Sequence, residues 1–79
     1  MNDYLATFHT HLSAMLSAQA LTEAGAETRM GPVPRQLSSS CGTCVRYRAA
    51  RDLRERLDTE CEALYREAGG TYQEVFRNE

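Results

Sequence analysis

The chain has 79 residues, with eleven acidic residues against nine arginines and no lysine, which gives a formal net charge of −2. A chain of this length buries only about 60% of the surface that its unfolded form exposes, so we expect one domain with a small core over residues 1–79. The charge excludes the basic field of nonspecific nucleic-acid binding, and no segment reaches the roughly 20 apolar residues that span a bilayer. The N-terminal residues lack the basic and apolar regions of a secretion signal, which predicts a cytoplasmic protein.

The first third of the chain alternates strand and helix patterns. Residues Tyr4–His9 alternate in polarity and are rich in aromatic and β-branched side chains, which predicts a strand. Thr10 can cap a helix with its hydroxyl, and the alanine- and leucine-rich run His11–Ala24 predicts that helix, ended by Gly25 in a left-handed conformation. A period of two resumes over Ala26–Val33, which predicts a second, peripheral strand. The apolar stripe of the helix is expected to contain Ala14, Ala18 and Leu21, widened by Met15 and by neighbouring rows with Leu12, Leu16 and Ala20.

The rest of the chain begins with a loop over Pro34–Thr43, where proline, serine, glycine and threonine dominate. Cys44–Tyr47 is short and β-prone and predicts a third strand. Arg48–Ala68 carries apolar residues every three or four positions and opposite charges four apart, which predicts a second helix with a solvated charged face. A Gly-Gly pair then stops the helix, and Thr71–Arg77 alternates as a final strand.

The predicted order βαββαβ matches a ferredoxin-like split βαβ sandwich, an α+β fold with two helices on one face of an antiparallel sheet. In that fold the first and second strands are parallel. His9, Thr10 and His11 would therefore face the loop that contains Cys41. A competing interpretation places Cys41 at the N-terminus of one long helix, as in thioredoxin-type proteins, and the poor helix formers that follow it count against this arrangement.

Cys41 and Cys44 form a Cys-x-x-Cys motif in this serine-rich loop. Thiols at this spacing can close a disulfide, share a metal, or act as nucleophile and resolving thiol. Three cysteines are too few for a disulfide framework, which favours a functional role for this pair. Cys61 occupies a leucine-like position in the predicted second helix, so we expect it to be an inert core residue.

Several donors are expected around the thiol of Cys41. A helix N-terminus offers unpaired N–H groups and about half a positive charge, which favours a thiolate, persulfide or selenide. Gly42 permits a backbone conformation that points N–H groups at the sulfur, and the hydroxyls of Ser39 and Ser40 can also donate to it. A patch for an anion or an acidic partner could be formed by Arg35, Arg46, Arg48 and Arg51.

Two segments resemble the selenium/sulfur carrier protein-like family: Tyr4–Thr10, and the run from Met30 through Pro-Val-Pro-Arg to Ser-Ser-Ser-Cys-Gly. The resemblance is carried by residues from Tyr4 to about Tyr47, with the remainder agreeing only in pattern. It implies that Cys41 is the thiol that carries sulfur or selenium. The residues that it places around this thiol are His9, Thr10, Pro34, Arg35, Ser39 and Gly42. The position of Cys44 departs from the family, where an apolar residue is common.

We therefore expect a sulfur or selenium carrier with Cys41 as acceptor and Cys44 as discharge thiol. Its expected partners are a donor, such as a cysteine desulfurase or a selenium-delivering protein, and an acceptor protein. No organic cofactor, nucleic acid or membrane is predicted as a partner. Two alternatives remain open at this point: a small dithiol–disulfide oxidoreductase, and an interaction module stabilised by zinc on Cys41, Cys44, His9 and His11.

Overall fold

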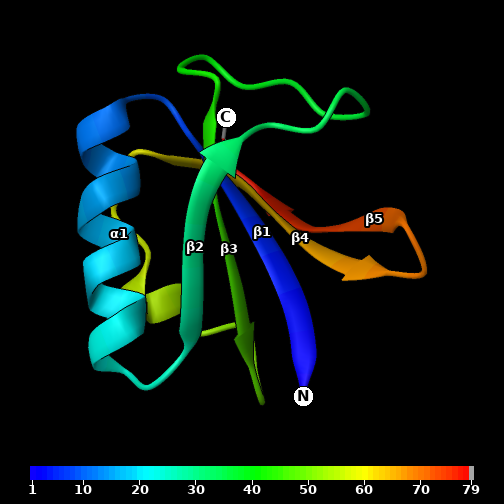
Figure 1. The fold of residues 1–79 in the computed structure, drawn as a ribbon. Helices are drawn as coiled ribbons and strands as arrows, with labels where there is room; N and C mark the ends of the chain where they lie inside the picture. The colour runs from blue at the N-terminus through cyan, green and yellow to red at the C-terminus, as the bar shows by residue number, and fades with distance from the viewer. Residues whose placement is uncertain (79) are drawn as a thin grey trace.

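The computed structural model describes residues 1–78, which form a five-stranded sheet with one α-helix beside it (Figure 1). No helix within this part of the chain is long and apolar enough to cross a membrane. The elements in chain order are β1 (Asn2–Phe8), α1 (His11–Glu23), β2 (Glu27–Pro32), β3 (Thr43–Ala49), the 3₁₀ helix η1 (Arg54–Arg56), β4 (Cys61–Ala68) and β5 (Thr71–Arg77).

The strand order is β2-β3-β1-β4-β5, and every neighbouring pair is antiparallel. Strand β1 lies at the centre, with Thr7 opposite Cys44 of β3 on one side and Ala63 of β4 on the other. Because β3 lies between them, β1 and β2 are parallel and form a split βαβ unit with α1. The ends of β1 and β2 and the starts of β3 and β4 therefore meet at the same end of the sheet, at the top in Figure 1. We call this end of the strands the upper edge.

The N-terminal elements are confirmed, but Leu12, Met15 and Leu16, which were predicted to widen the apolar stripe of the helix, are exposed. The hydroxyl of Thr10 caps α1 by accepting a hydrogen bond from the backbone N–H of Ser13 at 3.1 Å. Gly25 follows the helix with a φ of +93°, the left-handed conformation expected for it. Ala14 and Leu21 of the predicted stripe are fully buried, and Ala18 packs against the core from the same side. The second strand is an edge strand, as predicted.

The predicted second helix over Arg48–Ala68 is wrong, and with it the βαββαβ order. These residues form the end of β3, a connection with η1, and the whole of β4. The α+β class and the split βαβ unit hold, but the described residues contain one α-helix and five strands rather than two helices and four strands.

The error has a physical cause in strand β4. Both faces of this strand are covered, with Leu64 in the core on one face and Ala63 and Tyr65 in the core on the other, so consecutive residues are buried and the period-two pattern is hidden. The i,i+4 ion pair of Arg51 with Glu55 does form, but outside any α-helix. The two glycines after β4 have φ values of +59° and +81° and make a two-residue hairpin turn to β5, not a helix stop.

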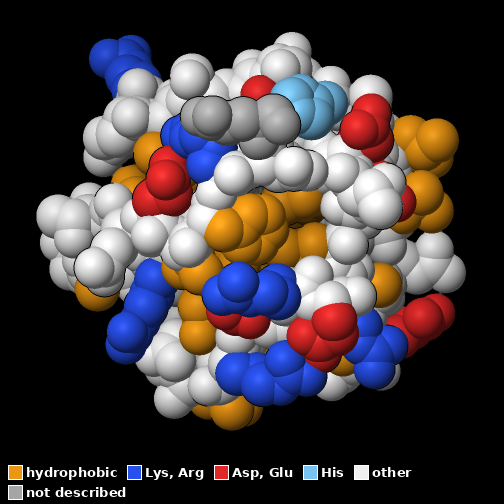
Figure 2. Space-filling view, turned by 180° about the vertical axis from the view of Figure 1, so that it is seen from behind, with side chains coloured by type: hydrophobic (Ala, Val, Ile, Leu, Met, Phe, Trp, Pro, Cys, Tyr) orange, Lys and Arg blue, Asp and Glu red, His pale blue; other side chains and the backbone are white. Residues whose placement is uncertain are grey.

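The core lies on both faces of the sheet. A helix-side cluster fills the space between the sheet and α1; its buried members are Tyr4, Ala6, Phe8, Ala14, Leu21, Ala26, Val45, Tyr47, Ala49, Cys61 and Leu64. A smaller far-side cluster on the opposite face consists of Leu5, Cys44, Ala63 and Tyr65. The face of the molecule turned away in Figure 1 shows apolar side chains at its centre, ringed by charged ones (Figure 2).

The connection between β3 and β4 is fixed to α1 and to β3 by buried polar contacts. The hydroxyl of Ser13 donates to the Asp58 carboxylate at 2.8 Å, and the Asp58 N–H donates to the hydroxyl of Ser17 at 2.8 Å. At the other end of the connection, the hydroxyl of Tyr47 donates to the backbone carbonyl of Asp52. These contacts hold the connection in place without the packing of a second helix.

We predict that Tyr47→Phe lowers the free energy of unfolding by about 1–2 kcal/mol, the usual cost of a lost buried hydrogen bond. The substitution keeps the ring, which stacks on Tyr4 with centroids 5.2 Å apart, and removes only the donor to Asp52. Urea unfolding measures the effect. Tyr72→Phe is the matched control, because that hydroxyl contacts an exposed arginine and its loss should change stability by less than about 0.5 kcal/mol. Equal stabilities of the two variants would contradict the assignment.

Candidate functional site

The predicted thiol loop, residues 33–42, joins β2 to β3 at the upper edge of the sheet. Its two ends are held together because the N–H of Val33 donates to the carbonyl of Gly42 at 3.2 Å. Inside the loop, the N–H of Leu37 donates to the carbonyl of Pro34 at 3.0 Å. Val33 and Leu37 pack against the far-side cluster, so the loop closes over that face of the sheet.

Cys41 lies at the end of this loop, half-buried, and packs against the helix-side cluster. Its thiol donates a weak hydrogen bond to the backbone carbonyl of Thr43 at 3.6 Å. The hydroxyl of Thr43 lies 3.4 Å from Nδ1 of His11, the first residue of α1. Gly42 has a φ of +72°, which lets the chain turn from Cys41 into β3. These contacts place the start of β3, two residues after Cys41, beside the first residue of α1.

Cys44 lies on the opposite face of the sheet. It is the second residue of β3, fully buried in the far-side cluster, and its thiol donates to the carbonyl of Pro32 at 3.4 Å. Burial raises the pKa of the Cys44 thiol, and the nearby charge of Arg46 only partly opposes this. All three cysteines are free thiols, and Cys41 and Cys44 pack against the clusters on opposite faces of the sheet.

Cys61 is a core residue, as predicted, although it begins strand β4 rather than lying on a helix. Burial raises the pKa of its thiol to about 12. Of the three cysteines, Cys41 is the one that keeps solvent access.

A group of polar contacts, the loop clamp, fixes the segment before Cys41 to β1 and β4. The hydroxyl of Ser39 donates to the carbonyl of Phe8 at 2.9 Å. Ser40 donates to the two carboxylate oxygens of Glu62, through its N–H at 3.2 Å and its hydroxyl at 2.8 Å. Nδ1 of His9 lies 3.3 Å from the Ser40 hydroxyl oxygen and 3.6 Å from the carboxylate. The clamp therefore joins His9, Ser39 and Ser40, three residues that the sequence had placed near the thiol.

Glu62 is the member of the clamp that sequence reasoning missed. The helical interpretation of Arg48–Ala68 put it on a solvated face, whereas β4 brings it to the thiol edge. Partial burial tends to raise the pKa of Glu62, but the hydrogen bonds from Ser40 and the nearby His9 outweigh it and hold the pKa below its usual value. A strand interpretation of Cys61–Ala68 would have placed this carboxylate beside the loop.

The clamp does not have the geometry of a nucleophilic triad. A triad uses both ring nitrogens of histidine, one toward the serine and one toward the acid. Here Ser40 and Glu62 both approach Nδ1 of His9, and the serine hydroxyl donates directly to the carboxylate. The arrangement holds the loop in position and leaves no base for the hydroxyl.

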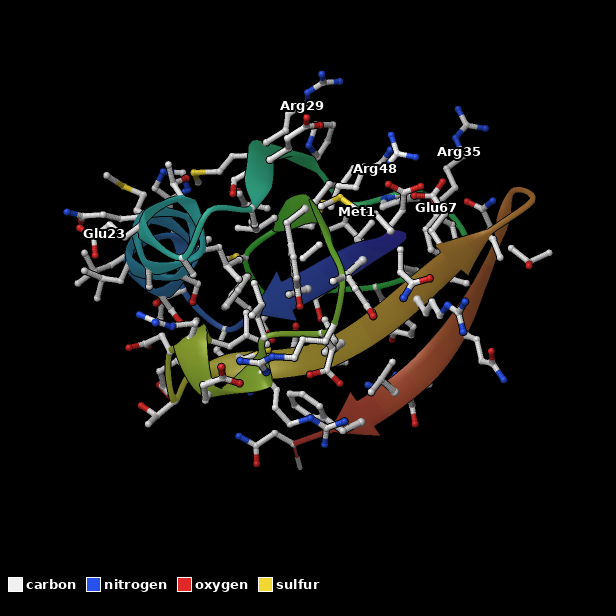
Figure 3. All side chains as sticks on the ribbon, turned by 90° about the horizontal axis from the view of Figure 1, so that it is seen from below. Met1, Glu23, Arg29, Arg35, Arg48 and Glu67 are labelled. Atoms are coloured by element: carbon white, nitrogen blue, oxygen red, sulfur yellow. The ribbon has the colours of Figure 1, made fainter. Side chains whose placement is uncertain are left out.

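The other predicted site residues are spread around the same edge. Thr10 serves as the cap of α1, Pro34 is half-buried at the start of the loop, and Arg35 is exposed and projects from the molecule (Figure 3). Of the predicted arginine patch, Arg51 pairs with Glu55 in the β3–β4 connection, whereas Arg46 and Arg48 lie two residues apart on β3. Within residues 1–78, no three histidine, cysteine or acidic side chains come together in a metal-binding group.

Fold and site define a small α+β protein that presents one accessible thiol at the edge of a sheet, beside a helix start. The sequence family described as "Putative Se/S carrier protein-like" matches residues 3–76, and the chain belongs to this family. The match confirms the resemblance and extends it past Tyr47 to β4 and β5. Comparison with curated proteins and with solved structures finds no match.

We predict that iodoacetamide at pH 8 modifies Cys41 in the folded protein and leaves Cys44 and Cys61 unmodified. Burial blocks access to the latter two, and a pKa of about 12 leaves Cys61 with about a thousandfold less thiolate than an ordinary cysteine. Peptide mass spectrometry locates the adducts. In urea all three thiols should react, and modification of native Cys44 as fast as Cys41 would contradict the burial argument.

We predict that Glu62→Gln destabilises the protein by about 1 kcal/mol near neutral pH, because the charged acceptor of two hydrogen bonds is lost. The pKa of Glu62 is lowered by folding, so its contribution is present above the unfolded value of about 4.3 and is lost as pH falls through the folded value. The thermal midpoints of wild type and variant should therefore converge at low pH. Glu60→Gln, at an exposed neighbouring position, should show no such convergence.

Proposed function

We propose that this protein carries sulfur or selenium as a persulfide or perselenide on Cys41. The observation that carries this proposal is the selective exposure of that thiol: Cys44 and Cys61 are 0% and 3% exposed, whereas Cys41 is half-buried at the sheet edge. Membership of the carrier-like family supports the identity of the cargo. The start of α1 beside the loop supports an anionic adduct, because a helix N-terminus favours negative charge.

The transfer is a thiol exchange without net oxidation. The Cys41 thiolate attacks the terminal sulfur of a persulfide on the donor, so that one S–S bond forms as the donor S–S bond breaks. The donor thiolate leaves and takes up a proton from solvent. An acceptor thiolate then attacks the terminal sulfur on Cys41, and the Cys41 thiolate is regenerated. With selenium as the terminal atom, the corresponding S–Se bonds form and break in the same order.

The geometry favours a carrier with one working thiol. Discharge by Cys44 would place its sulfur on the inner sulfur of the Cys41 adduct, with release of hydrosulfide and formation of a disulfide. In the folded chain Cys44 is sealed in the far-side cluster, while Cys41 packs on the helix side. Discharge by this route, and dithiol oxidoreductase activity of the same pair, would require the start of β3 to open.

The partners of this proposal are proteins that supply and receive the chalcogen. A cysteine desulfurase or a selenium-delivering protein fits the donor role, because each can present the atom at the end of an S–S or S–Se bond, where it is the electrophile that a thiolate attacks. The loop clamp supports this role, since it holds the segment before Cys41 at the protein surface where such a partner can reach it.

We predict that incubation with a cysteine desulfurase and cysteine adds one sulfur atom to the protein, and that peptide mass spectrometry places it on Cys41. Dithiothreitol should remove the added atom. Cys41→Ser should abolish loading, whereas the matched variants Cys44→Ser and Cys61→Ser should keep it. A parallel incubation with a selenocysteine lyase and selenocysteine compares the two cargoes. Loading on Cys44, or no loading of any cysteine by either donor, would overturn the proposal.

A further inference from the structure

The far side of the sheet contains an unusual pair of arginines. Arg29 on β2 and Arg46 on β3 lie directly opposite each other in the antiparallel register, and both side chains are exposed. Like charges in this position destabilise a sheet. A bound negative group would relieve this repulsion.

The described part of the chain does not supply that group. Its ion pairs within residues 1–78 use other arginines, and neither Arg29 nor Arg46 lies within ion-pairing distance of a carboxylate. Arg46 donates to the hydroxyl of Tyr72 at 3.4 Å, a neutral acceptor that orients its guanidinium. The neighbouring Arg48 differs from both, because it pairs with Asp3 at 3.6 Å.

The two arginines border a hollow of about 300 Å³ whose other lining residues are Met30, Gly31 and Pro32. No acidic residue lines it. A Cβ added at Gly31 would meet no atom within 4 Å, so the absence of a side chain there keeps the hollow open. Figure 3 shows Arg29 projecting freely from this side of the molecule, together with Arg48.

We propose that Arg29 and Arg46 bind a small tetrahedral oxyanion of the sulfate or phosphate type in this hollow. The planar guanidinium group donates two parallel hydrogen bonds to such an anion, and two of these groups match a double negative charge. An extended acidic peptide fits less well. The adjoining hollow, which is lined by Arg29, Arg46 and Arg48, also contains Asp3, Glu27 and Glu67, and these carboxylates would repel the further acidic side chains of a peptide that extends into it.

The oxyanion site is separate from the thiol site. Cys41 packs on the helix side, whereas Arg29 and Arg46 stand on the far side of the sheet. Binding of the anion therefore does not require Cys41, and the two proposals fail independently.

The test is a ¹H–¹⁵N NMR titration of the full chain with sodium sulfate and with sodium phosphate, against sodium chloride at matched ionic strength. We expect saturable shifts of the amides of residues 29–32 and 44–46 with the oxyanions and not with chloride. Arg29→Gln and Arg46→Gln should each weaken binding about tenfold, as expected for the loss of a charge-assisted contact. The two salts show whether sulfur or phosphorus oxyanions are preferred.

Arg56→Gln is the matched control, because Arg56 is an exposed arginine of η1 away from the hollow. The affinity of this variant for the oxyanions should equal that of the wild type. Without added oxyanion, Arg29→Gln should raise the thermal midpoint, since the repulsion across the β2–β3 pair is relieved. If Arg46→Gln fails to fold, the affinity of Arg29→Gln for the oxyanions still tests the proposed site. Equal shifts with chloride, unchanged affinity in both hollow variants, or binding of a glutamate-rich peptide in place of the oxyanions would overturn the proposal.

Discussion

The central pairing of β1 is the constraint on which the rest of the structure depends. Its hydrogen-bonded neighbours are β3 and β4, both antiparallel to it, so the end of β1 meets the starts of both strands. The register that sets Thr7 opposite Cys44 also decides that Cys44 faces away from α1. Because side chains alternate along a strand, a shift of one residue would move Val45, Tyr47 and Ala49 out of the helix-side cluster and turn Arg46 and Arg48 toward it. The same pairing brings Glu62 to the loop.

The N-terminal half of the fold was predictable because its signals are local. A capping threonine, an alanine-rich helix and a glycine in the left-handed region each act within a few residues. The region Arg48–Ala68 was not predictable in the same way. Its helical spacing of apolar residues competes with pairing to β1 and β5, which lie far away in the sequence, and the tertiary pairing decides the outcome.

For the site, the motif in the sequence located Cys41 and its neighbours His9, Ser39 and Ser40, and the structure gathers these at one edge. Two features of the site depend on how the strands pair and could not be predicted from the motif. Glu62 becomes part of the site only when residues 61–68 form a strand. The separation of the two thiols of the Cys-x-x-Cys motif follows from the point where β3 begins, at Thr43, which no local pattern marks. Spacing in the sequence therefore indicated a pair that the folded chain divides.

The loop clamp has a mechanical consequence for any cargo on Cys41. The thiol is two residues from a β-strand and follows a segment bound to β1 and β4, so the sulfur can move only by rotation of its own side chain. Carriers that transport a group on a long flexible arm visit successive sites by themselves. Under the proposed carrier function, the position of Cys41 is fixed instead, so donor and acceptor proteins would have to bring their reacting atoms to it. A donor or acceptor with a deeply recessed active site would need an extended segment of its own that reaches out to this edge.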